Sequence, residues 1–373
     1  MEFEFSQLLS DMVEARASDV HLTPGSPPML RVRGAIKPAE DYPTLTPQHT
    51  RDVVYSILND DQRKRFENQK ALDFAYAIPG VARFRVNCYF QRGAISAALR
   101  HTPDQIPALE TLGLPPVMRE MTKLPRGFVL VTGPTGSGKT TTLASMVDII
   151  NSEREEHILT IEDPIEFLHR HQKCIVNQRE IGSDAPDFSS ALRSALRQDP
   201  DVILVGEMRD LETVSTALTA AETGHLVFAT LHTQSASQTV DRMIDVFPPH
   251  QQQQVRMQLS IALQGIVTQQ LVPTADGVGR ACAAEVLVPT PAIRNLIREG
   301  KTHQIYSALQ TAGAMGMQTM DAHLAQLVRQ GTISRQVAEQ RASIPEELKR
   351  LLGGVQPLSS SLQPAPAVAF GMN

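Results

Sequence analysis

The sequence predicts an α/β protein with a parallel-type sheet, preceded by a smaller α+β domain. The chain has 373 residues, which is enough for two domains that each bury a core. From Gly127 onward, apolar strand candidates alternate with helical patterns, which is typical of a parallel sheet covered on both faces. Before that point the strand candidates are mixed with helices, which favours an α+β layer.

The smaller domain is predicted over residues 1–100. A helical pattern at residues 5–17 opens it, and a series of strand-like runs follows. These runs are "DVHLT", "MLRVRG", "LDFAYAI", "ARFRVNCYF" and "AISAALR". The next segment, residues 101–116, holds four prolines and few apolar runs, so we expect it to be a linker.

The larger domain is predicted over residues 117–290. Its strand candidates are "FVLVTG", "HILTI", "DVILVGE" and "HLVFATLH", and a hairpin-like pair follows around residues 266–289. The helical patterns that separate these strands lie near residues 140–151, 187–198, 210–222 and 235–245.

The end of the chain is predicted to consist of a helical region and a tail. Helical patterns dominate residues 291–352. Residues 353–373 are rich in Pro, Ser and Gly, and we expect them to be disordered.

Composition excludes several classes of protein. The formal net charge is −5 and the pI is about 6.1, so nucleic acid is not expected as a primary partner. The three cysteines, Cys88, Cys174 and Cys282, have neither zinc-ligand spacing nor an even count for disulfides, which favours a reducing cytoplasm. The acidic start differs from a signal peptide, and no run of about 18 apolar residues occurs. We therefore expect a cytoplasmic protein without a transmembrane segment, whose contact with a membrane is peripheral.

The clearest motif is "GPTGSGKT", which matches G-x-x-x-x-G-K-[ST] between an apolar strand and a helix. Its glycines let successive N–H groups face one anion, and the helix N-terminus adds its positive end. Lys139 would reach the outer phosphates of a nucleotide, and the Thr140 hydroxyl would ligate Mg²⁺. The alternative is a glycine-rich turn that binds nothing. The predicted nucleotide-binding residues of this segment are Gly133, Pro134, Thr135, Gly136, Ser137, Gly138, Lys139, Thr140 and Thr141.

Hydrolysis of a bound nucleotide also requires a carboxylate near the metal and a group that orients the attacking water. "DVILVGE" places Glu207 at the end of a buried-type strand, where an acid on the metal side is expected. The usual aspartate is missing, because Gly206 stands directly before Glu207. The alternative is that Glu207 only ends a strand at the solvent edge.

A second group of acids follows the strand candidate "HILTI", in the segment "TIEDPIEF". If that strand lies beside the P-loop strand, its carboxyl end opens on the same crevice as Lys139. From the residues alone Glu162, Asp163 and Glu166 are equal candidates for the base, and a solvated acidic turn is the alternative.

A histidine, His232, ends the strand candidate "HLVFATLHT". A lone histidine is more often structural than functional. Its position at the carboxyl end of a sheet strand instead favours a sensor of the phosphate state.

Four segments together resemble the Walker A, Asp, Walker B and His boxes of the secretion-superfamily ATPases, which drive type IV pili and type II secretion. They are "GPTGSGKT", "IEDPIEF", "RSALRQDPDVILVGEMRD" and "TAAETGHLVFATLHT". The glycine before Glu207 is that family's own form of Walker B. "ASDVHL", "PGVARFRVN" and "TPAIRNLIRE" resemble the twitching-motility retraction branch, the PilT type. The zinc module and long N-terminal extension of the pilus-extension branch are absent from the sequence.

The resemblance implies a homohexameric ring that powers pilus retraction from the inner face of the cytoplasmic membrane, through an inner-membrane platform protein. It implies a PAS-like N-terminal domain, a RecA-like motor domain, and ATP with Mg²⁺ bound between them. It favours Glu166 as the base, Glu207 beside the metal, and Arg85 and Arg100 near the phosphates. For the two arginines, ordinary surface charge is the alternative.

Other functions stay open at this point. The chain could be an accessory retraction motor, or an ATPase of pilus extension or type II secretion. RecA-like rings also include nucleic-acid translocases, and a nucleotide-binding regulator without turnover would share the P-loop.

Overall fold

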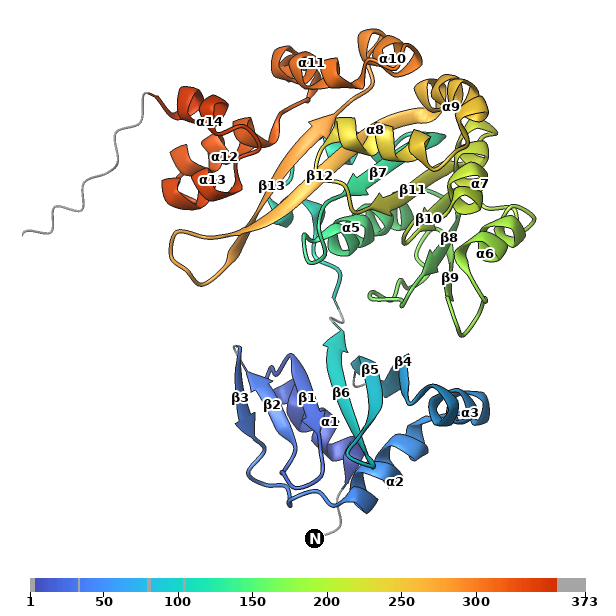
Figure 1. Cartoon of the computed structure of the whole chain (residues 1–373), viewed down its shortest axis with the longest axis vertical. Coiled ribbons are helices and arrows are strands. Elements are labelled where there is room, and N and C mark those ends of the chain that lie inside the picture. The colour runs from blue at the N-terminus through green and yellow to red at the C-terminus, as the bar shows by residue number, and fades with distance from the viewer. Residues whose placement is uncertain (1–3, 33, 79–81, 103–104, 354–373) are drawn as a thin grey trace, which may run out of the picture.

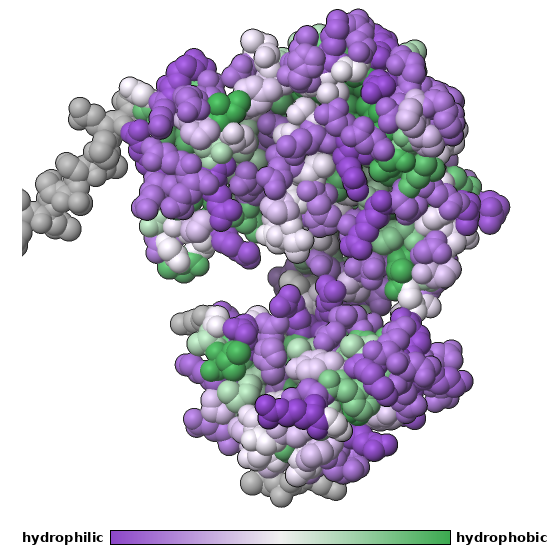
Figure 2. Space-filling view, in the orientation of Figure 1, coloured by the Kyte–Doolittle hydropathy of each residue, from purple (hydrophilic) through white to green (hydrophobic). Residues whose placement is uncertain are grey.

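The two sets of strand candidates fold into two separate sheets, one in each lobe of the computed structural model (Figure 1). The structure describes residues 4–32, 34–78, 82–102 and 105–353. We call residues 4–102 the N-terminal lobe and residues 105–353 the P-loop lobe. Figure 2 shows a mostly hydrophilic surface on one face of the molecule, hollowed between the two lobes.

The N-terminal lobe is a six-stranded antiparallel sheet with the strand order β3-β2-β1-β6-β5-β4, packed against helices. In β5, Phe84, Val86 and Cys88 enter the core, and Arg83 and Arg85 alternate with them on the other face. The strands are β1 (Asp19–Leu22), β2 (Met29–Val32), β3 (Ala35–Pro38), β4 (Ala71–Ile78), β5 (Ala82–Gln91) and β6 (Ala94–Thr102). The helices are α1 (Phe5–Glu14), α2 (Pro47–Ile57) and α3 (Asp60–Gln69).

The P-loop lobe contains a seven-stranded sheet with the order β13-β12-β7-β11-β10-β8-β9. All neighbours pair in parallel except β12 and β13, which form the expected hairpin, so the prediction of a parallel-type sheet is confirmed. Its strands are β7 (Gly127–Thr132), β8 (His157–Glu162), β9 (Ile175–Glu180), β10 (Val202–Val205), β11 (Leu226–Leu231), β12 (Leu263–Pro273) and β13 (Arg280–Leu287).

One condition considered for the acidic segment is not met. The strand "HILTI", which is β8, does not lie beside the P-loop strand β7, because β11 and β10 stand between them. Every residue of β10 and β11 is buried, so these strands occupy the centre of the sheet. The strand β9, which the sequence reading missed, has exposed positions and ends the sheet beside β8.

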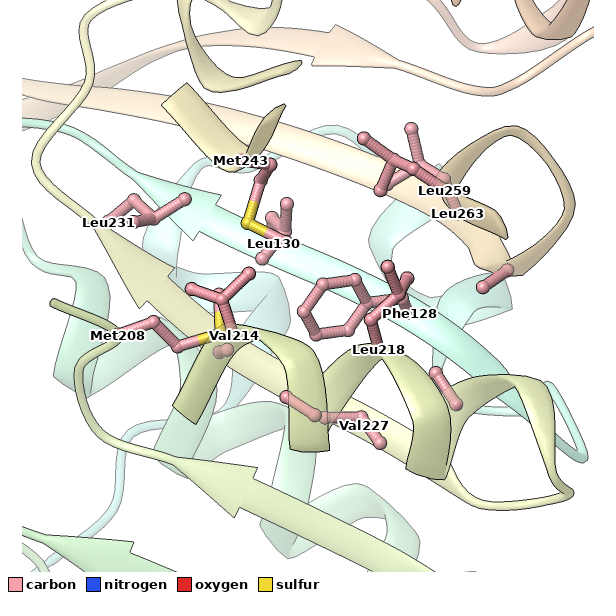
Figure 3. Packing of buried hydrophobic residues seen from close by; sticks show 14 of the residues in the cluster. Phe128, Leu130, Met208, Val214, Leu218, Val227, Leu231, Met243, Leu259 and Leu263 are labelled. Carbon is pink, nitrogen blue, oxygen red and sulfur yellow. The ribbon is translucent and has the colours of Figure 1, made fainter. Parts of the chain in front are cut away.

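Helices cover both faces of this sheet, as expected for parallel strands. On one face, Phe128 and Leu130 of β7 pack with Leu218 of α7, Met243 of α8 and Leu259 of α9 (Figure 3). On the other face, α5 packs against the alternate side chains of the same strands. The helices are α4 (Val117–Met121), α5 (Lys139–Glu153), α6 (Phe188–Ala195), α7 (Leu211–Glu222), α8 (Ala236–Asp245) and α9 (Pro249–Ala262).

The segment predicted as a linker over residues 101–116 is partly built into the two lobes. Strand β6 continues to Thr102, and a short 3₁₀ helix, η1, spans Leu109–Leu112. Leu109 is buried in the same cluster as α5, and Ser145 Oγ of α5 donates to the carbonyl oxygen of Pro107 at 2.7 Å. The segment with linker character is therefore shorter than predicted.

The C-terminal region is helical, as the sequence patterns indicate. In α10, Ile293 and Ile297 are buried, and the Arg294 guanidinium donates to the carbonyl oxygens of Ser260 and Ile261 at 2.5 and 2.9 Å. Arg294 thus binds the last carbonyls of α9. The elements are α10 (Pro291–Arg298), η2 (Thr302–Gln304), α11 (Ile305–Thr311), η3 (Gly313–Met315), α12 (Met320–Arg329), α13 (Arg335–Arg341) and α14 (Pro345–Leu352). The tail predicted over residues 353–373 lies, apart from Gly353, outside the described residues.

Across the described ranges, no helix combines the length and the apolar character that crossing a bilayer requires.

Candidate functional site

The P-loop joins the end of β7 to the start of α5, as its motif predicts. Gly133 has φ 137°, and a Cβ there would lie 2.3 Å from the carbonyl oxygen of Gln269 and 2.7 Å from Ser137 Oγ. Only glycine fits, because the loop turns tightly against β12. Gly138, with φ 90°, precedes α5 and offers no side-chain cap, so the first N–H groups of the helix are available to an anion.

Lys139, the first residue of α5, is buried at the base of this loop. Its Nζ donates to the carbonyl oxygens of Gly133 and Pro134 at 2.9 and 3.0 Å. Burial lowers the pKa of Lys139, and the carboxylates of Glu207 and Glu166 act in the opposite direction. Lys139 therefore lies within electrostatic reach of both predicted catalytic carboxylates.

The missing aspartate before Glu207 has a steric explanation. Gly206 follows β10 so closely that a Cβ would lie 3.1 Å from the carbonyl oxygen of Ile161 and 3.3 Å from the Cα of Glu162. The Gly206 N–H donates to that same Ile161 oxygen at 2.8 Å, and its own carbonyl oxygen accepts from Thr230 Oγ1 at 2.5 Å. A Cβ at this position would therefore press against the β8 backbone, which disfavours a side chain here.

We predict that Gly206→Asp destabilises the fold rather than supplying the usual acid. The new side chain would press against the β8 backbone, and overpacking of this kind costs about 1–3 kcal/mol. Thermal unfolding of the purified chain should show a lower Tm. The control is Gly313→Ala, since Gly313 has no neighbour within 4 Å of a Cβ and no positive φ. Equal melting temperatures for Gly206→Asp and the wild type would contradict the steric explanation.

Glu207 is held as a charged carboxylate. Arg209 donates to both of its oxygens at 2.6 Å, and His232 Nε2 lies 3.1 Å from Oε1. Burial acts to raise the pKa of Glu207, but the hydrogen bond and charge of Arg209, helped by His232 and Lys139, outweigh it and lower the pKa. Arg209, His232 and Lys139 surround this carboxylate, and its side chain is only 19% exposed, which disfavours the alternative of a solvated strand end. Arg209 is not among the residues predicted for the site, although it stands only two residues after Glu207.

His232 is placed against Glu207, at the carboxyl end of β11. Its predicted role as a phosphate sensor stays a prediction, and the contact places it beside the acid predicted for the metal.

The three acids of "TIEDPIEF" have different surroundings. Glu162 is buried, and its Oε1 accepts from Thr160 Oγ1 at 2.6 Å and from Gln178 Nε2 at 3.1 Å. Burial raises the pKa of Glu162, these two donors oppose that shift, and the charge of Glu166 adds to it. Asp163 is exposed and Glu166 is half-buried. Each acid lines a cavity: Glu162 a small one with Thr140, Asp163 one of about 380 Å³ with Glu180, and Glu166 a third.

That cavity, of about 190 Å³, lies between the lobes. Glu166 and Thr141 line it from the P-loop lobe, and Arg85 and Arg100, which are register neighbours on β5 and β6, line it from the N-terminal lobe. Arg100 Nε also donates to Asp19 Oδ1 at 2.9 Å. The structure therefore brings both predicted arginines to the same cavity as Glu166. Arg83, which the sequence reading did not select, lines this cavity as well.

The residues around the P-loop fit a Mg²⁺-nucleotide. Ser137 Oγ is buried and has no hydrogen-bond partner among the described residues, so it is available to a ligand. Thr140 lines a small cavity with Glu162 and Gly206. Within the described ranges, no group of three or more His, Cys, Asp or Glu side chains could hold a metal ion by itself. A P-loop does not require one, because phosphate oxygens and water complete the shell of the Mg²⁺.

Fold and site together define a P-loop α/β protein whose second lobe faces Glu166 and the start of the P-loop helix α5 across a cavity. The family model described as "Type II/IV secretion system protein" matches residues 2–342, and the chain belongs to this family.

The chain is similar to individual members of the family over most of its length. It is 53% identical over 343 residues to the "Type IV pilus retractation ATPase PilT" of Pseudomonas aeruginosa, which covers 92% of this chain and 99% of that protein. It is 50% identical over 321 residues to a "Twitching motility protein" of Neisseria gonorrhoeae, which covers 86% of each. The structure titled "Crystal Structure of the Pilus Retraction Motor PilT and Bound ADP" superposes with a TM-score of 0.89 at 51% identity, over 94% of this chain and 100% of that one.

Proposed function

We propose that this chain is an ATP-hydrolysing motor that powers retraction of type IV pili and hence twitching motility. The observation that supports this most strongly is end-to-end similarity to a pilus retraction ATPase in a chain that retains a complete P-loop. The gathering of Lys139, Glu166 and Glu207 around that loop adds chemical support.

Each group has a defined role in the proposed reaction. The loop N–H groups and the N-terminus of α5 bind the phosphates of ATP, and Lys139 turns from the loop carbonyls to the outer phosphates. Thr140 and Glu207 would hold Mg²⁺, partly through water, and a bound ion would supply positive charge to the phosphates. Glu166 orients the attacking water. Catalysis of this kind consists of positioning and charge stabilisation.

Arg85 and Arg100 would stabilise charge on the phosphates from the N-terminal lobe, which ties hydrolysis to the relative position of the two lobes. Repeated around a homohexameric ring, this coupling would convert hydrolysis into rotation of the lobes. The force would act on an inner-membrane platform protein, with the ring peripheral at the cytoplasmic face of the membrane.

A deletion strain tests the direction of the motor. Cells that lack this chain should accumulate surface pili and fail to twitch, because pili that are assembled cannot be withdrawn. Electron microscopy of surface pili and a twitching-zone assay measure both traits, with the wild-type gene on a plasmid as control. Bald cells would contradict retraction and support a motor for pilus extension.

A second assay separates the motor from a nucleic-acid translocase. ATP turnover by the purified chain should not rise when single-stranded DNA is added. Stimulation by DNA that falls with increasing salt would instead support the translocase.

A further inference from the structure

An ion pair joins the two lobes beside the proposed catalytic loop. Arg83 Nη2 on β5 lies 2.6 Å from Glu180 Oε2, at the end of β9. The side chains are only 16% and 8% exposed. A pair so far removed from water is sensitive to separation, because loss of either partner leaves an uncompensated buried charge.

The same carboxylate oxygen holds the loop that carries Glu166. Glu180 Oε2 accepts the backbone N–H of Ile165 at 3.1 Å, and Ile165 directly precedes Glu166. Ile165 itself is buried, so its side chain is held by packing. A change in the position of Ile165 would therefore also move Glu166. One oxygen atom therefore connects an arginine of the N-terminal lobe to the backbone of the residue that precedes the proposed base.

Glu180 is itself fixed within the P-loop lobe. Its N–H donates to Asp184 Oδ2 at 2.8 Å, and its carbonyl oxygen accepts the Asp184 N–H at 2.8 Å. On the other side, the Arg83 carbonyl oxygen accepts from Thr102 Oγ1 at 2.9 Å, which holds the arginine to the last residue of β6. The charge of Arg83 also favours the charged form of Glu162, so its influence extends to the start of the loop.

We propose that Arg83 and Glu180 are positioning residues that make the placement of Glu166 depend on contact between the two lobes. With the lobes together, Arg83 neutralises Glu180, and the carboxylate holds the Ile165 N–H and so the loop. When the N-terminal lobe moves away, Glu180 loses its cation and turns toward water, and the loop loses this restraint. Hydrolysis would then proceed only in subunits whose lobes are closed.

This inference rests on the proposed function, because it assigns Glu166 as the base. It differs from the arginine roles proposed above, since Arg83 acts through Glu180 and need not touch a phosphate.

Steady-state ATP hydrolysis by the full-length chain tests the coupling. In Arg83→Ala and Glu180→Gln we expect kcat to fall at least about tenfold, with KM for ATP changed less than about twofold, because a misplaced catalytic group costs rate rather than binding. Gln at position 180 retains an oxygen for the Ile165 N–H but removes the ion pair. The double variant should be no slower than the slower single variant, because both changes break the same contact. If the fold decrease in kcat of the double variant equals the product of the two single-variant decreases, the proposal is overturned.

Arg65→Ala is the matched control. Arg65 on α3 also crosses between the lobes, where its Nη1 donates to the carbonyl oxygen of Gly182 at 3.4 Å, but this contact does not involve the loop with Glu166. Its kcat should stay within about twofold of the wild type, because an exposed contact of this length contributes little. An equal fall in kcat in Arg65→Ala and Arg83→Ala would contradict the proposal, because it would show that any lost contact between the lobes has the same effect.

Hydrogen exchange provides a readout that does not depend on turnover. The amide of Ile165 should exchange at least about threefold faster in Arg83→Ala than in Arg65→Ala, since its acceptor is less restrained. Unchanged exchange at Ile165 would overturn the coupling. If Glu166→Gln abolishes turnover while Arg83→Ala leaves both kcat and exchange unchanged, the positioning role fails and the proposed function stands.

Discussion

Glu166→Gln should abolish ATP turnover while sparing ATP binding. The amide keeps the size of the side chain but removes the charge that orients the attacking water, and a general base contributes about 10²–10⁴-fold to rate. Glu166 lines the interlobe cavity with Thr141, directly beyond the residue proposed to hold the metal. The loop N–H groups and Lys139, which are proposed to bind the phosphates most directly, are not changed by this substitution, so affinity should be retained.

Phosphate release and titration with a fluorescent ATP analogue measure the two quantities separately. Asp163→Asn and Glu162→Gln provide the comparison, because these acids are the other candidates in the same segment. Glu162 already accepts hydrogen bonds from Thr160 and Gln178, so it is not expected to orient the water. The amide oxygen of Gln can still accept from these donors, and we therefore expect turnover to persist in Glu162→Gln. Loss of turnover in Asp163→Asn with a normal rate in Glu166→Gln would contradict the assignment.

Lys139→Ala should weaken ATP binding at least about tenfold. Hydrogen bonds to charged groups contribute about 1.5–3 kcal/mol each, and about 1.4 kcal/mol corresponds to tenfold in affinity. The melting temperature should not fall in parallel, because burial already disfavours the charge of this side chain, as its lowered pKa indicates. Calorimetric titration with ATP and a thermal melt of the same sample measure both effects.

Lys123→Ala is the control for this substitution. Lys123 is exposed, and its Nζ lies 2.8 Å from Glu120 Oε1 at the protein surface. Its removal should leave the affinity for ATP unchanged, since exposed ion pairs contribute little. Wild-type affinity in Lys139→Ala would contradict the proposal that this loop binds the phosphates.

Local patterns in the sequence were sufficient to locate the P-loop and most of the sheet. "FVLVTG" is apolar throughout and the glycines follow it at once, so strand, loop and helix could be read together. Strand order could not be read in this way. The positions of β10 and β11 between β7 and β8 depend on crossovers of the chain, which leave no local pattern.

The sequence predicted which residues belong to the candidate site, but not how their surroundings differ. Glu162 and Glu166 look equivalent in the sequence, and only folding shows that Gln178 of β9 reaches the first of them. The ion pair of Arg83 and Glu180 joins residues 97 positions apart, and no spacing could reveal it. Gly206 illustrates the opposite case. Its presence was visible in the sequence, but the reason for it lies in the backbone of a neighbouring strand.

A structure of the assembled ring with Mg²⁺ and a non-hydrolysable ATP analogue tests the central claim most directly. Our account predicts six subunits, with the γ-phosphate beside Lys139, Arg85 and Arg100 directed at the phosphates, and the in-line water on Glu166. A water held by Glu162 or Asp163 instead, or a nucleotide bound away from the cavity between the lobes, would contradict the account.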